Sequence, residues 1–394
     1  MKNVIKLAAK SDCTGCGACI AVCPKSAITF KHTNSLHFYP EIDFSKCVAC
    51  ETCIKICPQL SSQNHSRNKS LSFFAAYNND AVEREAASSG GVSGALALKG
   101  LNDGHYVCGV GFDNEWYLSH IVSKDVAILD KIRGSKYLFS DASYAIGKIR
   151  TLLCDSKKVL FFGTPCQVDG LVNTIPQKYR GGLITCEILC HGVNSPIVWS
   201  DSISWLQTCH HGLLTSYNFR SKSHGWGNSA RGGANLRVAY TMDNGVHKDV
   251  PAYKNLFHSW FGHHYMMRES CFRCKYRSEH RISDITIGDF WGVENILTIE
   301  SQSKGVSAVL CNTLAGAEFV RQSNLHLIEV DADKTKSMLK GYSKQIKDPE
   351  PQLRSMREFE QEYLSYGFKY MARKYRTQTL LERIFAALKC RLHI

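Results

Sequence analysis

The chain has 394 residues, which is enough for two or three domains. Hydrophobic residues make up 44% and charged residues 21%, and this composition excludes a largely disordered, collagen-like or coiled-coil chain. The formal net charge is +13. No apolar run has the length of a membrane span or the form of a signal peptide, so we expect a cytoplasmic protein.

Cysteine is unusually frequent, with 18 residues in the chain. A cytoplasmic compartment keeps thiols reduced, so structural disulfides are not expected there. We therefore interpret the spacing of the cysteines as metal or redox chemistry.

Two copies of the pattern C-x2-C-x2-C-x3-C-P lie within residues 1–60. In this pattern three closely spaced thiolates bind one cluster, and the fourth reaches the other cluster. We therefore expect two [4Fe-4S] clusters, with one ligand of each exchanged between the copies. The expected ligands are Cys13, Cys16, Cys19 and Cys57 for one cluster, and Cys47, Cys50, Cys53 and Cys23 for the other. A pair of zinc sites is the alternative, but zinc does not explain the doubled run. The segment resembles a bacterial two-cluster ferredoxin.

Residues 61–72 are polar and rich in serine, which predicts a linker between separately packed units. From Phe73 onward, short apolar runs alternate with helix-like stretches, which predicts a mixed α/β body. The turn Ser88 to Gly91 precedes an apolar stretch from Val92 to Leu101. This arrangement suits a phosphate at a helix N-terminus, and a plain helix cap is the alternative.

Two later apolar runs each deliver a cysteine at their carboxyl end: Lys158 to Phe162 leads to Cys166, and Leu183 to Leu189 leads to Cys190. A third run, Asp284 to Ile287, leads to Asp289. Open α/β sheets gather their ligands at the carboxyl ends of strands, so we expect these ends to converge.

The C-x2-C of Cys271 and Cys274 supplies half of a metal site. With Cys166 and Cys190 it predicts a third [4Fe-4S] cluster. The alternatives are zinc on the same four residues, a redox-active dithiol and buried inert thiols. The remaining cysteines are predicted to be inert core residues; they are Cys108, Cys154, Cys186, Cys209, Cys311 and Cys390.

Several motifs, in their order and spacing, resemble the coenzyme F-420 hydrogenase/dehydrogenase β-subunit family. They are ASSGG (87–91), GSKY (134–137), GTPCQ (163–167), CHGVNSP (190–196), and CFRCKYR (271–277) followed by SDITIGDFWG (283–292). The resemblance spans residues 73 to 320. Because the ferredoxin segment precedes this region, the chain resembles the bacterial branch of the family that is found with polysaccharide biosynthesis genes. It implies bound FAD, at least one iron-sulfur cluster, and electron transfer to or from a substrate.

The resemblance also implies site residues. The flavin-binding candidates are Ser88, Ser89, Gly90, Gly91, Ser135, Lys136, Tyr137, Thr164, Pro165 and Gln167. Gly90 and Gly91 would let the backbone approach the pyrophosphate, and Lys136 would offset charge on the cofactor, with a solvated surface lysine as the alternative. His191 is expected to donate a hydrogen bond or relay a proton, or else to be structural. Asp289 is expected to be a buried proton donor, or else a turn cap.

Charge is concentrated toward the C-terminus, where residues 336–394 hold 13 Lys and Arg against 6 Asp and Glu. The stretch Thr379 to Ile394 has the spacing of a basic amphipathic helix, which suits an anionic membrane or a partner protein, and core packing is the commoner alternative. The glycine-rich, basic stretch Phe219 to Gly233 is predicted to be a loop facing an anionic substrate, or else a plain mobile loop. No nucleic-acid-binding signature accompanies the charge.

These features predict an α+β protein with an N-terminal two-cluster ferredoxin-type domain (1–60), a linker (61–72), a flavin-binding body in two parts (73–155 and 156–335) and a basic helical tail (336–394). We expect an oxidoreductase that passes electrons from a ferredoxin-type or other redox partner protein through the clusters to FAD and a small-molecule substrate. The family resemblance suggests an intermediate of surface-polysaccharide synthesis as the substrate. We expect the protein in the cytoplasm or at the inner face of the membrane. The alternative is a non-catalytic subunit that delivers electrons to a partner protein.

Overall fold

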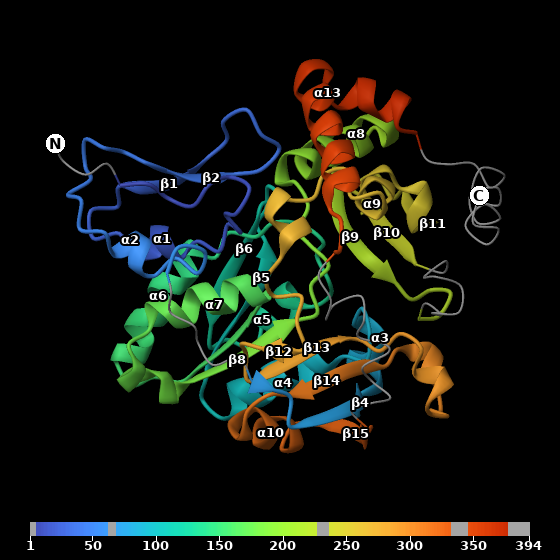
Figure 1. The fold of residues 1–394 in the computed structure, drawn as a ribbon. Helices are drawn as coiled ribbons and strands as arrows, with labels where there is room; N and C mark the ends of the chain where they lie inside the picture. Colours follow the sequence, from blue (N-terminus) through green and yellow to red (C-terminus); the bar gives the residue numbers. More distant parts are fainter. Residues whose placement is uncertain (1–4, 62–67, 227–235, 332–345, 377–394) are drawn as a thin grey trace.

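The computed structural model describes residues 5–61, 68–226, 236–331 and 346–376. Within these residues, eight strands form one mixed sheet in the order β15-β4-β14-β13-β8-β7-β5-β6 (Figure 1). The strands are β4 (Ser72–Asn78), β5 (Tyr106–Phe112), β6 (Leu118–Ser123), β7 (Val159–Gly163), β8 (Leu183–Ile188), β13 (Ile285–Asp289), β14 (Ser307–Cys311) and β15 (Leu325–Glu329). The predicted combination of helices with a mixed sheet is confirmed.

The centre of this sheet is parallel. β7 pairs in parallel with β5 on one side and with β8 on the other, and β8 pairs in parallel with β13. The carboxyl ends of β7, β8 and β13 therefore meet at one edge, as the three apolar runs predicted. This edge is where the chain delivers Cys166, Cys190 and Asp289.

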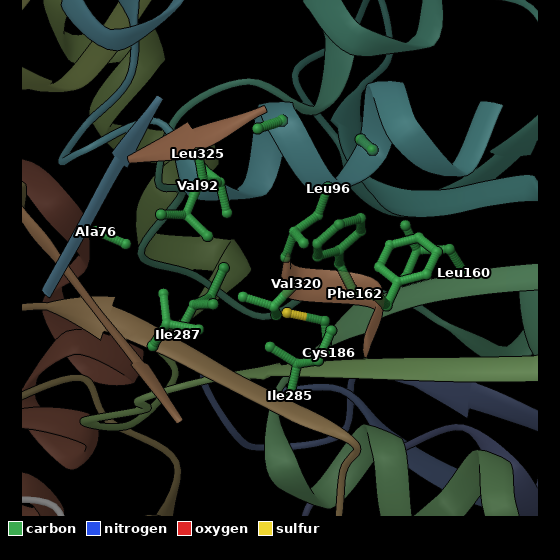
Figure 2. Packing of buried hydrophobic residues seen from close by; sticks show 14 of the residues in the cluster. Ala76, Val92, Leu96, Leu160, Phe162, Cys186, Ile285, Ile287, Val320 and Leu325 are labelled. Atoms are coloured by element: carbon green, nitrogen blue, oxygen red, sulfur yellow. The ribbon is translucent and has the colours of Figure 1, made fainter. Parts of the chain in front are cut away.

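The sheet is buried on both faces, which explains why its central strands are almost continuously apolar. Leu160 and Phe162 of β7 pack with helix α4 (Val92–Asn102) in one core cluster, as Figure 2 shows. Val159 and Phe161 point the other way, into a second cluster. That cluster is covered by α6 (Ser143–Cys154) and α7 (Pro165–Thr174). Because both faces of β7 are packed, the direction in which the chain leaves β7 and begins α7 is fixed.

A second unit covers the carboxyl edge of the sheet. It contains α8 (Pro196–His210), the antiparallel strands β9 (Leu214–Ser221), β10 (Arg237–Met242) and β11 (His247–Pro251), α9 (Leu256–Gly262) and α13 (Glu350–Lys374). Trp199, Phe219, Trp260 and Phe359 share its core. Part of the predicted basic tail is thus a helix packed into the body, and the amphipathic stretch Thr379 to Ile394 lies outside the described residues.

The N-terminal domain consists of α1 (Ala18–Ala21), the hairpin β1 (Ile28–Lys31) and β2 (Tyr39–Ile42), and α2 (Thr52–Lys55). It has a small core of its own around Ile5, Ile28 and Cys53, and it is docked on the body. A β-carbon on Gly17 would lie 2.9 Å from the backbone nitrogen of Ser143 in α6. Glu360 of α13 accepts hydrogen bonds from the Ser35 hydroxyl and from the Leu36 backbone.

Shorter elements connect these units. They are β3 (Asn68–Lys69), α3 (Ala81–Ala86), α5 (Ile128–Ile132), η1 (Gln177–Gly182), η3 (Ala252–Lys254), η4 (Glu269–Arg273), β12 (His280–Arg281), η5 (Val293–Asn295), η6 (Gln302–Lys304) and α10 (Leu314–Arg321). β3, at the end of the predicted linker, pairs with β12. The division of the body between residues 155 and 156 stays a prediction, since β5 and β7 from its two sides are neighbours in one sheet. Among the described helices, none has the length and apolar character needed to cross a membrane.

Candidate functional site

Two groups of thiols surround two small cavities in the N-terminal domain. Cys13, Cys16, Cys19 and Cys57 line one cavity, and we name them the proximal thiol group. Cys23, Cys47, Cys50 and Cys53 line the other, and we name them the distal thiol group. The last cysteine of each copy thus lies with the first three cysteines of the other copy, which is the exchange that the doubled motif predicts. Their role as ligands stays a prediction.

The backbone follows the same path in both copies of the motif. Gly15 and Gly17 have positive φ angles of 71° and 83°, and the equivalent Ala49 and Glu51 have 54° and 60°. Glycine adopts this conformation without strain, whereas other residues do so at a cost. The first copy requires glycine for a second reason: a β-carbon on Gly15 would lie 2.9 Å from the Arg268 side chain. The exposed second copy has room for side chains.

The donor set of both groups fits an iron-sulfur cluster, because four thiolates per site are the ligands that such clusters take. Burial raises the pKa of Cys16 and of Cys19 well above the ordinary value, and neighbouring thiols add to both effects. Thiolates in this environment therefore need a bound cation. Within the described ranges, no set of three or more His, Cys, Asp or Glu side chains is close enough to bind a single metal ion. A cubane of four irons takes its four thiolates at wider spacing than a single ion does, so both groups stay compatible with a cluster.

A third set of thiols gathers at the carboxyl edge of the large sheet. Cys166 lies in the first turn of α7, Cys190 follows β8, and Cys271 and Cys274 lie in and just after η4. Burial, followed by the thiols of Cys271, Cys166 and Cys274, raises the pKa of Cys190. Burial likewise raises the pKa of Cys166 to about 12, with Cys274 and Cys271 adding to the increase. We call these four residues the internal thiol group.

Helix α7 links the internal and proximal thiol groups. Its first turn carries Cys166, and a β-carbon on its Gly170 would lie 2.9 Å from Sγ of Cys16. The hydroxyl of Tyr276 donates a hydrogen bond to Asp169 of the same helix at 2.6 Å. Burial, followed by Asp169 and then Cys166 and Cys16, raises the pKa of Tyr276 well above its usual value. The helix therefore sets the separation of the two thiol groups, and sequence analysis did not single out Asp169, Gly170 or Tyr276.

Replacing Gly170 by Ala is expected to destabilise the protein by about 1–3 kcal/mol, because the added methyl group has no space beside Cys16. Urea unfolding of the full chain followed by circular dichroism measures the change. Gly147→Ala is the matched control, since nothing lies within 4 Å of a β-carbon on this helical glycine. The control should stabilise α6 by about 0.5–1 kcal/mol. Equal effects of the two substitutions would contradict this account of α7.

A cavity of about 820 Å³ lies between the carboxyl edge of the sheet and the unit built from β9 and α9. It lies within the size range of small-molecule and cofactor sites. The flavin-binding candidates that line it are Ser88, Ser89, Gly91, Ser135, Lys136, Tyr137, Thr164 and Gln167. Cys190, His191 and Asp289 also line it, so the internal thiol group borders the cavity. Gly90 and Pro165 do not belong to the lining.

The turn before α4 brings backbone and side chains to this cavity. Gly91 is the N-cap of α4 with φ of 80°, and the following residues Val92 and Ser93 line the cavity. The hydroxyl of Ser88 accepts a hydrogen bond from the Ser135 backbone at 2.8 Å, which joins the two motifs. Gly90 also serves packing on β4, because a β-carbon there would lie 2.5 Å from the Ala76 carbonyl oxygen. Its expected place beside a pyrophosphate stays a prediction.

Lys136 is not a solvated surface lysine. Its Nζ donates hydrogen bonds to the carbonyl oxygens of Arg133 at 2.8 Å and Gly134 at 3.3 Å. Burial lowers the pKa of its ammonium group to about 7. An amine with this pKa at the wall of a cavity takes up a proton when an anionic group binds beside it.

Asp289 accepts hydrogen bonds and does not stand as an isolated buried acid. Its Oδ2 lies 2.8 Å from Arg220 Nη1, and its Oδ1 accepts from the Trp226 indole at 3.0 Å. Although burial opposes the charged form, Asp289 and Tyr137 raise the pKa of Arg220. The tyrosine hydroxyl accepts from the same guanidinium at 2.9 Å. This network favours a positioning role for Asp289 over the expected proton donor.

His191 lies at the rim of the cavity, where its Nε2 is 2.7 Å from Nε2 of His264. Burial of the ring, followed by His264 and Arg277, lowers the pKa of His191 to about 4. In a neutral imidazole pair, one ring donates a hydrogen bond to the other. This arrangement agrees with either expected role of His191. Sequence analysis missed His264, because it is distant from His191 in the chain.

The stretch Phe219 to Gly233 is a loop only in part. Phe219 and Arg220 belong to β9, and both line the cavity. Residues 227–235 lie outside the described residues.

The cysteines predicted to be inert fall into two sets. Cys108, Cys186 and Cys311 are buried, whereas Cys154 and Cys209 are exposed and are not core residues.

Comparisons with known proteins give two matches to families. Residues 12–60 match the family described as a 4Fe-4S dicluster domain, and residues 156–335 match the family described as the C terminus of the coenzyme F420 hydrogenase/dehydrogenase beta subunit. A solved chain of the F420-reducing [NiFe] hydrogenase complex from Methanosarcina barkeri is 16% identical, with 81% of this chain and 97% of that chain covered and a TM-score of 0.38. No curated protein matches the chain. The two family matches confirm the resemblance over residues 12–60 and 156–335, and the motifs at 87–91 and 134–137 lie outside the matched residues.

Proposed function

We propose that this chain, which carries a 4Fe-4S dicluster domain and the C-terminal domain of the coenzyme F420 hydrogenase/dehydrogenase β-subunit family, is an oxidoreductase that moves electrons through [4Fe-4S] clusters to FAD and a substrate. The observation that carries the proposal is a continuous series of thiol groups from the surface to the large cavity. Cys50 of the distal group is exposed. Cys16 of the proximal group lies close to Cys166 of the internal group, and Cys190 lines the cavity.

The order of the three groups follows from their positions. The distal group, whose Cys50 is exposed, is suited to accept electrons from a ferredoxin-type or other redox partner protein. The proximal group lies against α7, whose first turn carries Cys166. The internal group borders the cavity through Cys190, so its residues would hold the last cluster before the cofactor. Each cluster supplies one-electron transfer when it is bound.

The lining of the cavity supports FAD as the cofactor. The N-terminus of α4 with the Ser88 to Gly91 turn would hold the pyrophosphate, because backbone N–H groups at a helix N-terminus favour anions. Lys136 would place a positive charge beside the bound cofactor. Arg220, held by Asp289 and Tyr137, presents a second positive charge to the cavity, as a guanidinium. FAD supplies the conversion between one-electron and two-electron chemistry.

The substrate would share the same cavity, on the side formed by α9. His258, Phe261 and His263 line this side, and the ring of Tyr137 lies 5.3 Å from that of Phe261. The Tyr137 ring therefore lies beside the α9 side of the cavity. We keep an intermediate of surface-polysaccharide synthesis as the proposed substrate on the strength of the motif resemblance alone.

Anaerobic purification of the full chain followed by iron, sulfide and flavin analysis tests the proposal. We expect about twelve irons and one FAD per chain, with the visible absorption of both cofactors. A protein that holds its iron but takes up no FAD on reconstitution would contradict the flavin assignment. It would favour the alternative of a non-catalytic subunit that delivers electrons to a partner protein.

FAD binding is expected to be accompanied by proton uptake at pH 8. Burial lowers the pKa of Lys136 from 10.5 to about 7, so its amine is mostly neutral at pH 8 in the free protein. An anionic cofactor raises this pKa again, and the amine then takes up a proton. Uptake should decrease below pH 7, where the amine is already charged. Calorimetric titration with FAD in two buffers of different ionisation enthalpy measures it.

Lys136→Met is the matched variant for this titration, since methionine keeps most of the apolar stem and has no titratable group. It should bind FAD more weakly and without the proton uptake. The same uptake in the variant and in the unchanged protein would show that another group titrates.

A further inference from the structure

Arg268 is fully buried at the contact between the N-terminal domain and the body. Its Nε donates a hydrogen bond to the Cys13 carbonyl oxygen at 2.8 Å, and its Nη2 donates to the Phe38 carbonyl oxygen at 2.9 Å. Nη2 also lies 3.9 Å from Sγ of Cys13. The guanidinium of a residue in the body thus contacts a cysteine of the proximal thiol group directly.

The charge of this buried cation is not balanced by a carboxylate of the described residues. Among the residues that the structure describes, no carboxylate lies within ion-pair distance of Arg268, and its Nη1 has no hydrogen-bond partner. The Tyr39 ring lies 4.3 Å from the guanidinium and adds a cation–π contact, which carries no negative charge. An uncompensated buried charge costs several kcal/mol, so an anion is expected close to Nη1.

The orphaned Nη1 lies beside Gly15 of the proximal copy of the motif. A β-carbon on Gly15 would lie 2.9 Å from Cζ and 3.1 Å from Nη1 of Arg268. Gly15 lines the same cavity as the four thiols of this group. A cluster bound by four thiolates is negatively charged and has sulfur atoms that accept hydrogen bonds. It would supply both the missing anion and the missing acceptor.

We propose that Arg268 is the electrostatic partner of the proximal cluster and raises its reduction potential. The cluster becomes more negative when it takes up one electron, and a buried guanidinium stabilises this state more than the oxidised one. No proton moves and no bond forms or breaks in this step. The electron comes from the distal cluster during turnover. This inference rests on the proximal-cluster part of the proposed function and not on the flavin.

The distal thiol group lacks such a partner among the described residues. The lysines near it are Lys25, Lys46 and Lys55, and all three are exposed. Lys46 and Lys55 also lie beside Asp43 and Glu51. Exposed charges of this kind are screened by water and salt. The two copies of one motif therefore differ electrostatically through a residue of the body.

Arg268→Gln and Arg268→Met in the full chain test the proposal. Anaerobic titration with dithionite, a one-electron reductant, followed by electron paramagnetic resonance measures the midpoint potential of each cluster. We expect one cluster to shift to a more negative potential in both variants, with the iron content and the other potentials unchanged. Arg357→Gln is the control, because this exposed guanidinium pairs with Glu269 next to Arg268. It should shift none of the potentials.

Unchanged potentials in both variants at full iron content would overturn the proposal. If the neutral variants instead lose about four irons, Arg268→Lys decides by charge: retention of the iron supports the electrostatic role, and loss of it contradicts that role. A failure to bind FAD would leave these potentials measurable, so the failure of the flavin assignment is distinguishable from failure of this inference.

Discussion

Replacing Cys190 by Ser is expected to lower the iron content by about four per chain and to stop reduction of the flavin by the N-terminal clusters. Cys190 lies with Cys166, Cys271 and Cys274, and it lines the large cavity. Each iron of a cubane cluster needs a ligand, so the loss of one thiol removes the cluster. Iron analysis and anaerobic stopped-flow absorption measure the two effects. Ser at Cys166, Cys271 or Cys274 should give the same result.

Cys186→Ser is the matched control for this prediction. Cys186 lies on β8, the strand that leads to Cys190, but it is buried in the apolar core beside Ile285. Its replacement should cost about 1–3 kcal/mol of stability and leave the iron content unchanged. An unchanged iron content in Cys190→Ser, or zinc in place of iron in the unchanged protein, would remove the internal cluster from the proposed path.

Replacing Cys57 by Ser is expected to remove the proximal cluster and to leave the cluster of its sequence neighbours in place. Cys57 lines the cavity of Cys13, Cys16 and Cys19, although it closes the second copy of the motif. Cys23→Ser should remove the distal cluster for the converse reason. Each single variant should lose about four irons.

Double variants distinguish this exchange from ligation within each copy. Cys57→Ser combined with Cys13→Ser should lose no more iron than either alone, because both thiols serve one cluster. Cys57→Ser combined with Cys47→Ser should lose about eight irons. The reverse pattern of losses would show that each copy binds its own cluster.

These experiments bear on the docking of the N-terminal domain as well as on ligation. This domain contacts the body through Arg268 and through the close approach of Gly170 to Cys16. Such contacts hold the proximal and internal thiol groups at a fixed separation. Electron transfer from the proximal to the internal cluster depends on this separation. It therefore requires the docked full chain, because an isolated ferredoxin-type domain lacks the internal thiol group.

Local sequence was sufficient wherever the chemistry lies in contiguous residues. The doubled motif predicted the pairing of Cys57 with Cys13, Cys16 and Cys19, because the ligand spacing and the proline lie within one short segment. Apolar runs predicted β7, β8 and β13, because strands buried on both faces are apolar throughout. The Gly-rich turn before α4 was predicted for the same reason of local pattern.

Only the tertiary structure decided which distant residues meet. Arg268 is 255 positions from Cys13 in the chain, and no periodicity or spacing connects them. Asp289 was expected to be a buried proton donor or a turn cap, and the strand β9 brings Arg220 to it. Gly90 was expected to let the backbone approach a pyrophosphate. The structure adds that Gly90 packs against the Ala76 carbonyl oxygen, where a side chain has no space. In each case the residue type is visible in the sequence, whereas the partner is set by long-range packing that leaves no local pattern.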